Sequence, residues 1–330
     1  MDTGGPSRAP ASMATVSLCA RSGAEQEEPM VNRRSLAIAL AALLCFVAGS
    51  ARADTTTSLA PASGDGTFVQ VYGARIHYVE AGSGPVVILL HGLADDVGVW
   101  KATLEALSRR YRVIALDQIG FGKSDKPLLS YRVETFVDFL DGFVLALKID
   151  RASFVGNSLG GWVAAAYALA HPERVDRLAL VDSAGYAALR RSLGPDMFNA
   201  LHLRSRADFR RLAPLTFYDR RFYQDDPGDS LLAERVKIGD GYTIDRFLDS
   251  MARGEDVLDH RLRRLRRPTL IVWGRDDGLI PLSFGRRFQR DIAGSKLVVI
   301  DKCGHMPQVE CAQDLDGALL RFLDGGDAVR

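Results

Sequence analysis

Short, continuous apolar runs alternate with stretches of helical spacing along most of the chain. Continuous runs of this kind are typical of strands buried on both faces of a parallel sheet. They occur at residues 86–90, 113–116, 153–155, 178–181, 270–272 and 297–300. Helical spacing between them predicts helices over residues 100–109, 133–147, 159–170, 284–291 and 315–323. This alternation predicts an α/β fold with a mostly parallel, doubly wound sheet.

An antiparallel hairpin is expected ahead of the parallel strands. Residues 68–71 and 75–80 alternate apolar and polar side chains around Gly73, which is the pattern of two strands joined by a tight turn. Residues 54–67 are rich in Thr, Ser, Ala, Pro and Gly and are interpreted as a spacer. We therefore expect one domain over residues 68–330.

One interval breaks the alternation of strands and helices. Residues 186–259 contain no convincing buried strand, and their side chains lie at helical spacings interrupted by Pro195, Pro214 and Pro227. A structureless loop of that length is improbable inside a compact domain. The interval is therefore predicted to be a mostly helical cap inserted between two strands.

The N-terminal segment has the pattern of an export signal. Paired arginines precede an apolar run at residues 36–48 and a small-residue frame that ends at Ala53, which are the three regions of a secretory signal. The run is shorter than the roughly 20 residues that span a bilayer. Residues 1–53 are predicted to be a leader and signal peptide, with Met30 as a possible true start. We expect a periplasmic or secreted protein with no stable membrane span after cleavage, exported by either the general or the twin-arginine route.

Composition and charge exclude several classes of protein. Of the 330 residues, 47% are hydrophobic and 25% are charged, which excludes a collagen-like, coiled-coil or wholly disordered chain. Lys and Arg number 42 against 41 Asp and Glu, so the net charge of +1 gives no overall attraction to nucleic acid. The basic run at residues 261–267 is interpreted as a solvated surface. We therefore expect no nucleic-acid partner.

A nucleophile motif follows the third predicted parallel strand. Residues 156–161 read Gly-Asn-Ser-Leu-Gly-Gly and lead directly into a predicted helix. A serine between glycines at a sharp strand-to-helix turn is the setting of a nucleophile elbow, where crowding excludes side chains at the two glycine positions, 156 and 160. Ser158 is therefore the predicted nucleophile.

A serine hydroxyl needs a base that is oriented by an acid. His305 is the predicted base because it follows the last strand, in a loop that opens at the carboxyl edge of the sheet. Asp277 follows the strand before it and is the predicted acid. Asp276 beside it and Asp182, at the end of the strand before the cap, remain alternatives.

Five motifs in order resemble those of the α/β-hydrolase superfamily. They are His91-Gly92, the loop from Asp117 to Ser124, residues 156–161, the WGRDD segment at 273–277 and the GHMPQVE segment at 304–310. This resemblance implies an α/β-hydrolase fold, and it implies that the backbone amides of Leu93 and Leu159 form an oxyanion hole. It further implies that Glu310 anchors the histidine loop. No cofactor is implied, and no cluster of residues has metal-ligand spacing.

The reaction class follows from the nucleophile. The chain is similar to exported bacterial esterases and lipases, which implies cleavage of a small-molecule or lipid carboxylic ester through an acyl-enzyme on Ser158. Related dehalogenases and epoxide hydrolases carry aspartate at this position. The alternatives are a carbon–carbon bond hydrolase of the meta-cleavage-product type, a perhydrolase-like activity and a catalytically silent binding module. Acyl-chain length, leaving group, lid opening and oligomeric state stay open.

Two cysteines flank the predicted catalytic histidine. Cys303 and Cys311 remain after the predicted leader is removed, and export would expose them to oxidising conditions. Either a disulfide or two buried thiols fits this pattern, because spacing alone does not fix the Cα separation.

Overall fold

A computed structural model describes residues 66–224 and 228–326. The predicted leader, residues 1–53, and nearly all of the predicted spacer lie outside the described residues. The first strand begins at Thr67, so the last spacer residue is already part of the hairpin.

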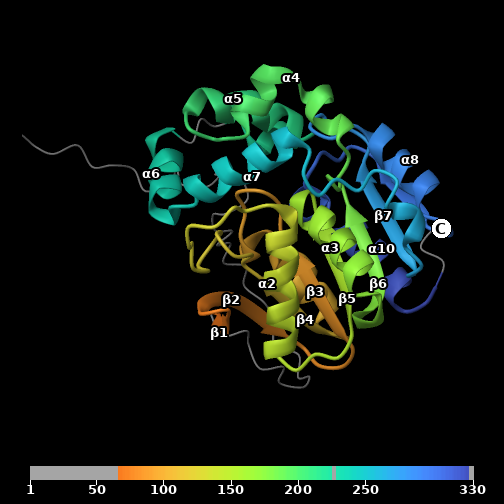
Figure 1. Ribbon diagram of the computed structural model, residues 1–330. Helices are drawn as coiled ribbons and strands as arrows, with labels where there is room; N and C mark the ends of the chain where they lie inside the picture. Colours follow the sequence, from red (N-terminus) through yellow and green to blue (C-terminus); the bar gives the residue numbers. More distant parts are fainter. Residues whose placement is uncertain (1–65, 225–227, 327–330) are drawn as a thin grey trace, which may run out of the picture. The chain divides into compact units, whose positions relative to one another are not determined.

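The described strands form one sheet in the order β1-β2-β4-β3-β5-β6-β7-β8 (Figure 1). β1 pairs antiparallel with β2, and β2 pairs antiparallel with β4; the remaining pairs are parallel. The bounds are β1 Thr67–Val71, β2 Ala74–Ala81, β3 Val86–Leu90, β4 Arg112–Leu116, β5 Ala152–Asn157, β6 Val175–Val181, β7 Thr269–Gly274 and β8 Lys296–Ile300. The predicted hairpin and the mostly parallel sheet are both confirmed.

The central strands are apolar throughout because helices cover both faces of the sheet. On β3, Ile88 and Leu90 belong to the core cluster on one face, whereas Val87 and Leu89 belong to the cluster on the other. All four side chains are fully buried. This two-sided burial explains why the sequence shows continuous apolar runs rather than alternation.

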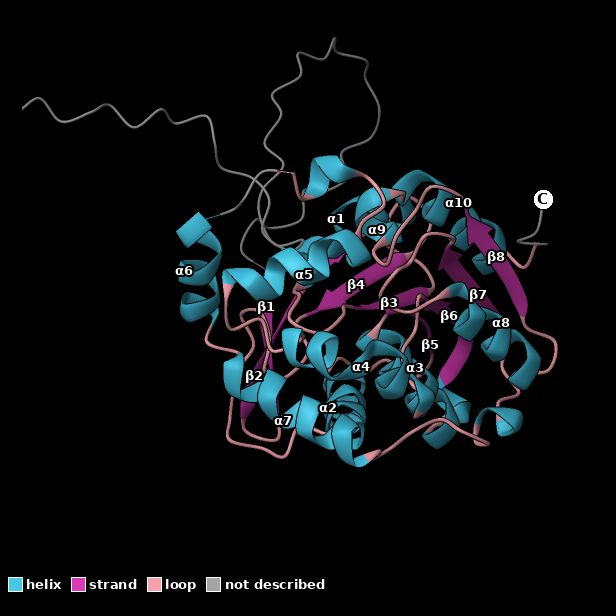
Figure 2. Cartoon of the chain, turned by 90° about the horizontal axis from the view of Figure 1, so that it is seen from above, coloured by secondary structure: helices cyan, strands magenta, loops and turns pink. Residues whose placement is uncertain are grey.

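Two layers of helices enclose the sheet. Helices α2, α3 and α8 lie against one face, and α1, α9 and α10 lie against the other (Figure 2). Their bounds are α1 Lys101–Leu107, α2 Val133–Ala146, α3 Leu159–Ala170, α8 Leu282–Asp291, α9 Pro307–Glu310 and α10 Ala312–Leu323. Short 3₁₀ turns lie at Val97–Trp100, Pro172–Arg174, Arg220–Phe222 and Leu262–Arg264.

Four helices lie between β6 and β7 in the chain. They are α4 Ala188–Ala200, α5 Arg206–Thr216, α6 Gly228–Ile238 and α7 Gly241–Arg253, and they form a separate group beside the sheet (Figure 1). Two predicted interruptions behave differently. Gly194, with φ of 69°, kinks α4 just before Pro195, whereas Pro214 lies inside α5, which continues to Thr216.

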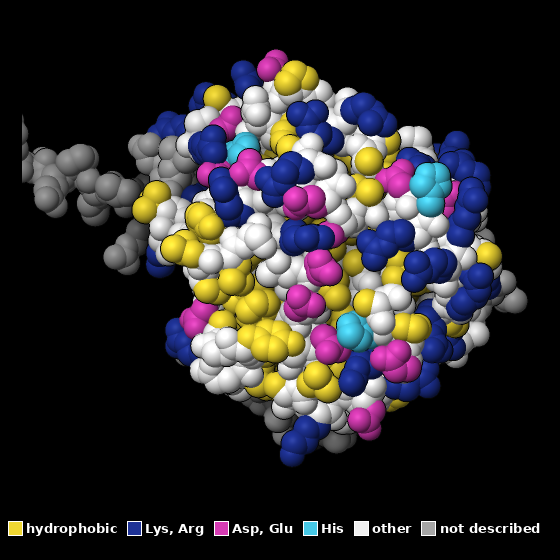
Figure 3. Space-filling view, in the orientation of Figure 1, with side chains coloured by type: hydrophobic (Ala, Val, Ile, Leu, Met, Phe, Trp, Pro, Cys, Tyr) yellow, Lys and Arg dark blue, Asp and Glu magenta, His cyan; other side chains and the backbone are white. Residues whose placement is uncertain are grey.

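The charged surface agrees with the near-zero net charge. Lys and Arg side chains are interspersed with Asp and Glu on the face shown in Figure 3. Ion pairs elsewhere in the described chain include Arg112 with Glu80 at 2.7 Å and Arg287 with Asp259 at 2.7 Å. Among the described helices, none combines the length and the apolar character needed to cross a membrane.

Candidate active site

Ser158 stands at a strained turn between β5 and α3. Its backbone has φ of 55° and ψ of −116°, which is an unfavourable region for a residue with a side chain. A Cβ on Gly156 would lie 2.2 Å from the Gly160 carbonyl oxygen, and a Cβ on Gly160 would lie 2.2 Å from the Leu90 carbonyl oxygen. Both glycines are therefore required by close packing around the turn, as the motif predicts.

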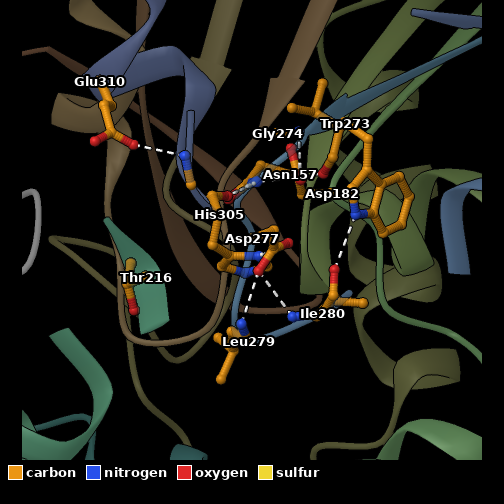
Figure 4. A network of polar contacts seen from close by, with 12 residues as sticks. Asn157, Asp182, Thr216, Trp273, Gly274, Asp277, Leu279, Ile280, His305 and Glu310 are labelled. Carbon is orange, nitrogen blue, oxygen red and sulfur yellow. Dashed lines mark hydrogen bonds and ion pairs between the residues drawn. The ribbon is translucent and has the colours of Figure 1, made fainter. Parts of the chain in front are cut away.

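His305 and Asp277 form a buried hydrogen-bonded pair. His305 Nδ1 lies 2.8 Å from Asp277 Oδ2, and both residues are buried. The other carboxylate oxygen, Oδ1, accepts hydrogen bonds of 2.8 Å from the backbone amides of Leu279 and Ile280 (Figure 4). Since Nδ1 is engaged by the acid, Nε2 is the ring nitrogen left to exchange a proton with a nucleophile.

The other two candidate acids form no hydrogen bond with His305, whose Nδ1 is hydrogen-bonded to Asp277. Asp276 is exposed to solvent. Asp182 is fully buried and its Oδ1 accepts a 2.9 Å hydrogen bond from the Gly274 amide. Burial, and then the neighbouring Asp277 carboxylate, raise the pKa of Asp182 well above its usual range. Among the three, the geometry singles out Asp277.

Three backbone contacts hold the histidine loop. The Glu310 Oε2 accepts a 2.7 Å hydrogen bond from the Gly304 amide, which is the anchoring contact that the resemblance implies. The Asn157 side chain donates to the His305 carbonyl oxygen at 3.0 Å, and the His305 amide donates to the Thr216 carbonyl oxygen at 2.6 Å (Figure 4). Asn157 lies within the elbow motif, but Thr216 belongs to α5, and nothing in the sequence points to it.

The end of α5 contacts the loops of both predicted catalytic partners. We call residues Leu215–Asp219 the tether segment. The Gly278 amide, next to the acid, donates to the Leu215 carbonyl oxygen at 3.0 Å. At its other end, the Asp219 amide donates to Glu310 Oε1. The tether segment therefore joins the acid loop to the histidine loop.

One pocket brings the predicted residues together. Ser158 and His305 line it, as do Leu93 and Leu159, the predicted oxyanion residues. The space is about 770 Å³, including solvent at its mouth. Most of its wall is apolar, and the segment between β6 and β7 contributes Leu189, Leu193, Leu201, Leu203, Leu212, Phe247, Leu248 and Met251. An acyl group of several carbons fits such a wall.

His91 supports the turn that carries Leu93. Its Nε2 accepts a 3.0 Å hydrogen bond from the Gln118 amide, and Nδ1 lies 2.8 Å from the Gly92 carbonyl oxygen. Complete burial lowers the pKa of His91, so its imidazole is neutral at neutral pH. Ala94 follows with φ of 65°, in the left-handed region, and the residues on either side of it, Leu93 and Asp95, line the pocket.

Within the described part of the chain, two groups of side chains come close enough to be considered as metal ligands. Donor atoms of Asp182, Asp277 and His305 lie within 4.8 Å of one another, as do those of Cys303, Glu310 and Cys311. In the first group, His305 Nδ1 is hydrogen-bonded to Asp277 Oδ2. In the second group the two sulfur atoms are bonded to each other and cannot bind as thiolates. Neither group presents a free set of ligands.

A disulfide joins Cys303 to Cys311, with Cα atoms 6.2 Å apart. It closes the loop that holds His305 and Glu310. Replacing both cysteines with serine should lower the free energy of unfolding by about 2–3 kcal/mol, because the unfolded chain gains loop freedom. Denaturant unfolding measures this loss, and reduced wild-type protein is the matched control. The oxidised protein should have a mass two hydrogens below the thiol form; the full thiol mass would contradict the bridge.

Comparisons with known proteins agree with this fold. The model of the alpha/beta hydrolase fold matches residues 85–227 and 254–311. The chain is 32% identical over 268 residues to 2-hydroxymuconate semialdehyde hydrolase of Pseudomonas sp. (strain CF600), which covers 78% of this chain and 93% of that protein. It is 32% identical over 257 residues to 2-hydroxy-6-oxo-2,4-heptadienoate hydrolase of Pseudomonas putida, which covers 74% of this chain and 91% of that protein.

Two of the similar solved structures differ in the class of hydrolase to which they belong. A bacterial membrane phospholipase A superposes with a TM-score of 0.71 at 31% identity, over 79% of this chain and 86% of that one. A meta-cleavage product hydrolase from Pseudomonas fluorescens IP01 superposes with a TM-score of 0.69 at 32% identity, over 79% and 98%. The curated relatives named above are carbon–carbon hydrolases of meta-cleavage products, so they match the predicted alternative better than the predicted ester cleavage.

Proposed function

Since the chain belongs to the α/β-hydrolase fold family, we propose that it hydrolyses a carbon–carbon bond next to a ketone, in substrates of the meta-cleavage-product class. The hydrolase chemistry rests on one observation: His305, which is hydrogen-bonded to the buried Asp277, lines the same pocket as the strained Ser158. The choice of bond rests on the relatives that act on 2-hydroxy-6-oxo-dienoates.

The proposed steps use this chain's own groups. Ser158 Oγ bonds to the ketone carbon while its proton passes to His305 Nε2, and Asp277 stabilises the resulting imidazolium. The backbone amides of Leu93 and Leu159 hold the developing oxyanion. The carbon–carbon bond then breaks and the leaving carbon takes the proton from His305. Water, deprotonated by His305, finally hydrolyses the acyl-enzyme ester and releases the acid.

Ester cleavage is the second candidate. The same attack on a carbonyl serves an ester, with an alcohol leaving in place of carbon. Two observations favour it: the apolar wall of the pocket and the likeness to a membrane phospholipase A. The export signal in residues 1–53, which remains a prediction, also favours an ester substrate met outside the cell.

Paired substrates separate the two candidates. Purified protein is assayed with 2-hydroxy-6-oxohepta-2,4-dienoate and with nitrophenyl butyrate and octanoate. We expect kcat/KM for the dienoate to exceed both ester values by about tenfold or more. A tenfold ratio corresponds to a difference of only about 1.4 kcal/mol in transition-state binding between the two substrates.

The Ser158→Ala variant is the control for both reactions. The reverse ranking of substrates would assign the protein to ester hydrolysis. Dienoate binding without turnover of any substrate would indicate the silent binding module instead.

A further inference from the structure

Asp95 is a carboxyl group in the active-site pocket that the proposed reaction does not use. It follows the predicted oxyanion residue Leu93 by two positions, after the turn at Ala94. Only 6% of its surface is exposed, and it lines the pocket together with Ser158.

The carboxyl lies next to the nucleophile. A Cβ placed on Gly92 would stand 3.0 Å from Asp95 Oδ2 and 3.4 Å from Ser158 Cβ. The other carboxyl oxygen, Oδ1, is buried and has no hydrogen-bond partner among the described residues. A buried polar atom without a partner is unfavourable, so its presence beside a reacting centre points to a partner supplied by the substrate.

The neighbouring polar side chains of the pocket are already engaged. The Asn157 amide group donates to two carbonyl oxygens and accepts from Gln308. The Thr216 hydroxyl donates to the Leu212 carbonyl oxygen. Among the described lining residues outside the Ser158–His305 pair, Asp95 therefore offers the side-chain oxygen with unused hydrogen-bonding capacity.

We propose that Asp95 determines specificity by hydrogen-bonding a hydroxyl or enol group that the substrate carries close to the scissile carbonyl. The inference rests on the proposed acyl-transfer function of Ser158 and names a feature of its substrate. A site built around such a hydrogen bond discriminates strongly against an analogue that lacks the hydroxyl, because the buried carboxyl is then left unpaired. A plain apolar ester therefore leaves this capacity unused.

The charge state of Asp95 suits this task. Burial, and then the carboxylate of Asp96, raise the pKa of Asp95 to about 8; Arg235 lowers it and Asp240 raises it. At neutral pH the group is mostly protonated, so it both donates and accepts, which matches a hydroxyl or enol. Above pH 8 it is ionised and only accepts.

Matched esters test the proposal. Wild-type protein, Asp95→Leu and Asp95→Asn are assayed with propyl butyrate, 2-hydroxyethyl butyrate and propyl 3-hydroxybutyrate, which place a hydroxyl on either side of the ester. In Asp95→Leu we expect the kcat/KM ratio of the preferred hydroxylated ester to propyl butyrate to fall about tenfold or more. In Asp95→Asn the same ratio should fall less, since the amide side chain still forms hydrogen bonds.

Controls separate specificity from structure and from the proposed function. Asp138→Leu makes the same change on the exposed side of α2 and should leave the ratio unaltered. If the thermal midpoint of Asp95→Leu drops and all esters are slowed equally, Asp95 has a structural role and the proposal is overturned. An unchanged kcat/KM ratio in folded Asp95→Leu would also overturn it. Absence of Ser158-dependent hydrolysis of every ester and of the dienoate would instead overturn the proposed function itself.

Discussion

Ser158→Ala should lower kcat for the preferred substrate by about 10⁴- to 10⁶-fold, because no other group in the pocket replaces the nucleophile. The protein should keep its fold, since alanine removes only the hydroxyl from a position where the backbone supplies the structural hydrogen bonds. The Ser158 amide donates to Val181 and its carbonyl oxygen accepts from Ala184. Covalent labelling by a fluorophosphonate, read by intact mass, measures the loss independently of the substrate.

Ser183→Ala is a matched control for this variant. Ser183 is buried close to the elbow, and its hydroxyl donates to the Ala184 carbonyl oxygen. Labelling of this variant should equal that of the wild type. Undiminished labelling of Ser158→Ala would show that another residue is the nucleophile.

Asp277→Asn should lower kcat by about 10³- to 10⁴-fold, because an amide cannot hold His305 in the tautomer that leaves Nε2 free. Asp182→Asn should cost less than about tenfold, since Asp182 contacts the Gly274 amide rather than the histidine.

Steady-state kinetics on both variants, with circular dichroism to verify folding, measures the difference. If Asp182→Asn proved the more damaging change, the acid would have to be moved to the end of β6. Equal and small effects would mean that the two carboxyl groups substitute for one another.

Local signals in the sequence were sufficient to predict the sheet and to select the residues that the structure brings together in the candidate site. The strands could be predicted because two-sided burial leaves continuous apolar runs. Ser158 could be predicted because crowding at the turn demands Gly156 and Gly160. His305 and Asp277 could be predicted because each follows a strand at the same edge of a parallel sheet.

Contacts between distant segments could not be predicted. Thr216 holds the histidine loop through its backbone oxygen, which any residue could supply, so its side chain gives no signal. In the sequence, Asp95 is simply one of two adjacent acidic residues and gives no sign of a special role. Only the fold places it in the same pocket as Ser158. The bridge between Cys303 and Cys311 depends on a Cα separation that sequence spacing leaves open.

The local motifs also could not predict which bond is cleaved. A serine, a histidine and two backbone amides attack a ketone or an ester in the same way. Ester cleavage was the leading prediction because of the export signal, whereas the curated relatives favour the carbon–carbon alternative. The two reactions differ in the leaving group that the pocket must bind. Binding of that group depends on pocket residues such as Asp95.

The tether segment limits how this protein can be re-engineered. Helical insertions of this kind invite exchange between homologues as a way to change substrate range. Here the segment Leu215–Asp219 also positions Gly278 and His305. A chimaera that replaces everything from α4 to α7 would therefore change the walls of the pocket and would also misalign the predicted base, His305. Grafts that keep residues 215–219 and exchange only the flanking helices should separate substrate range from catalytic competence.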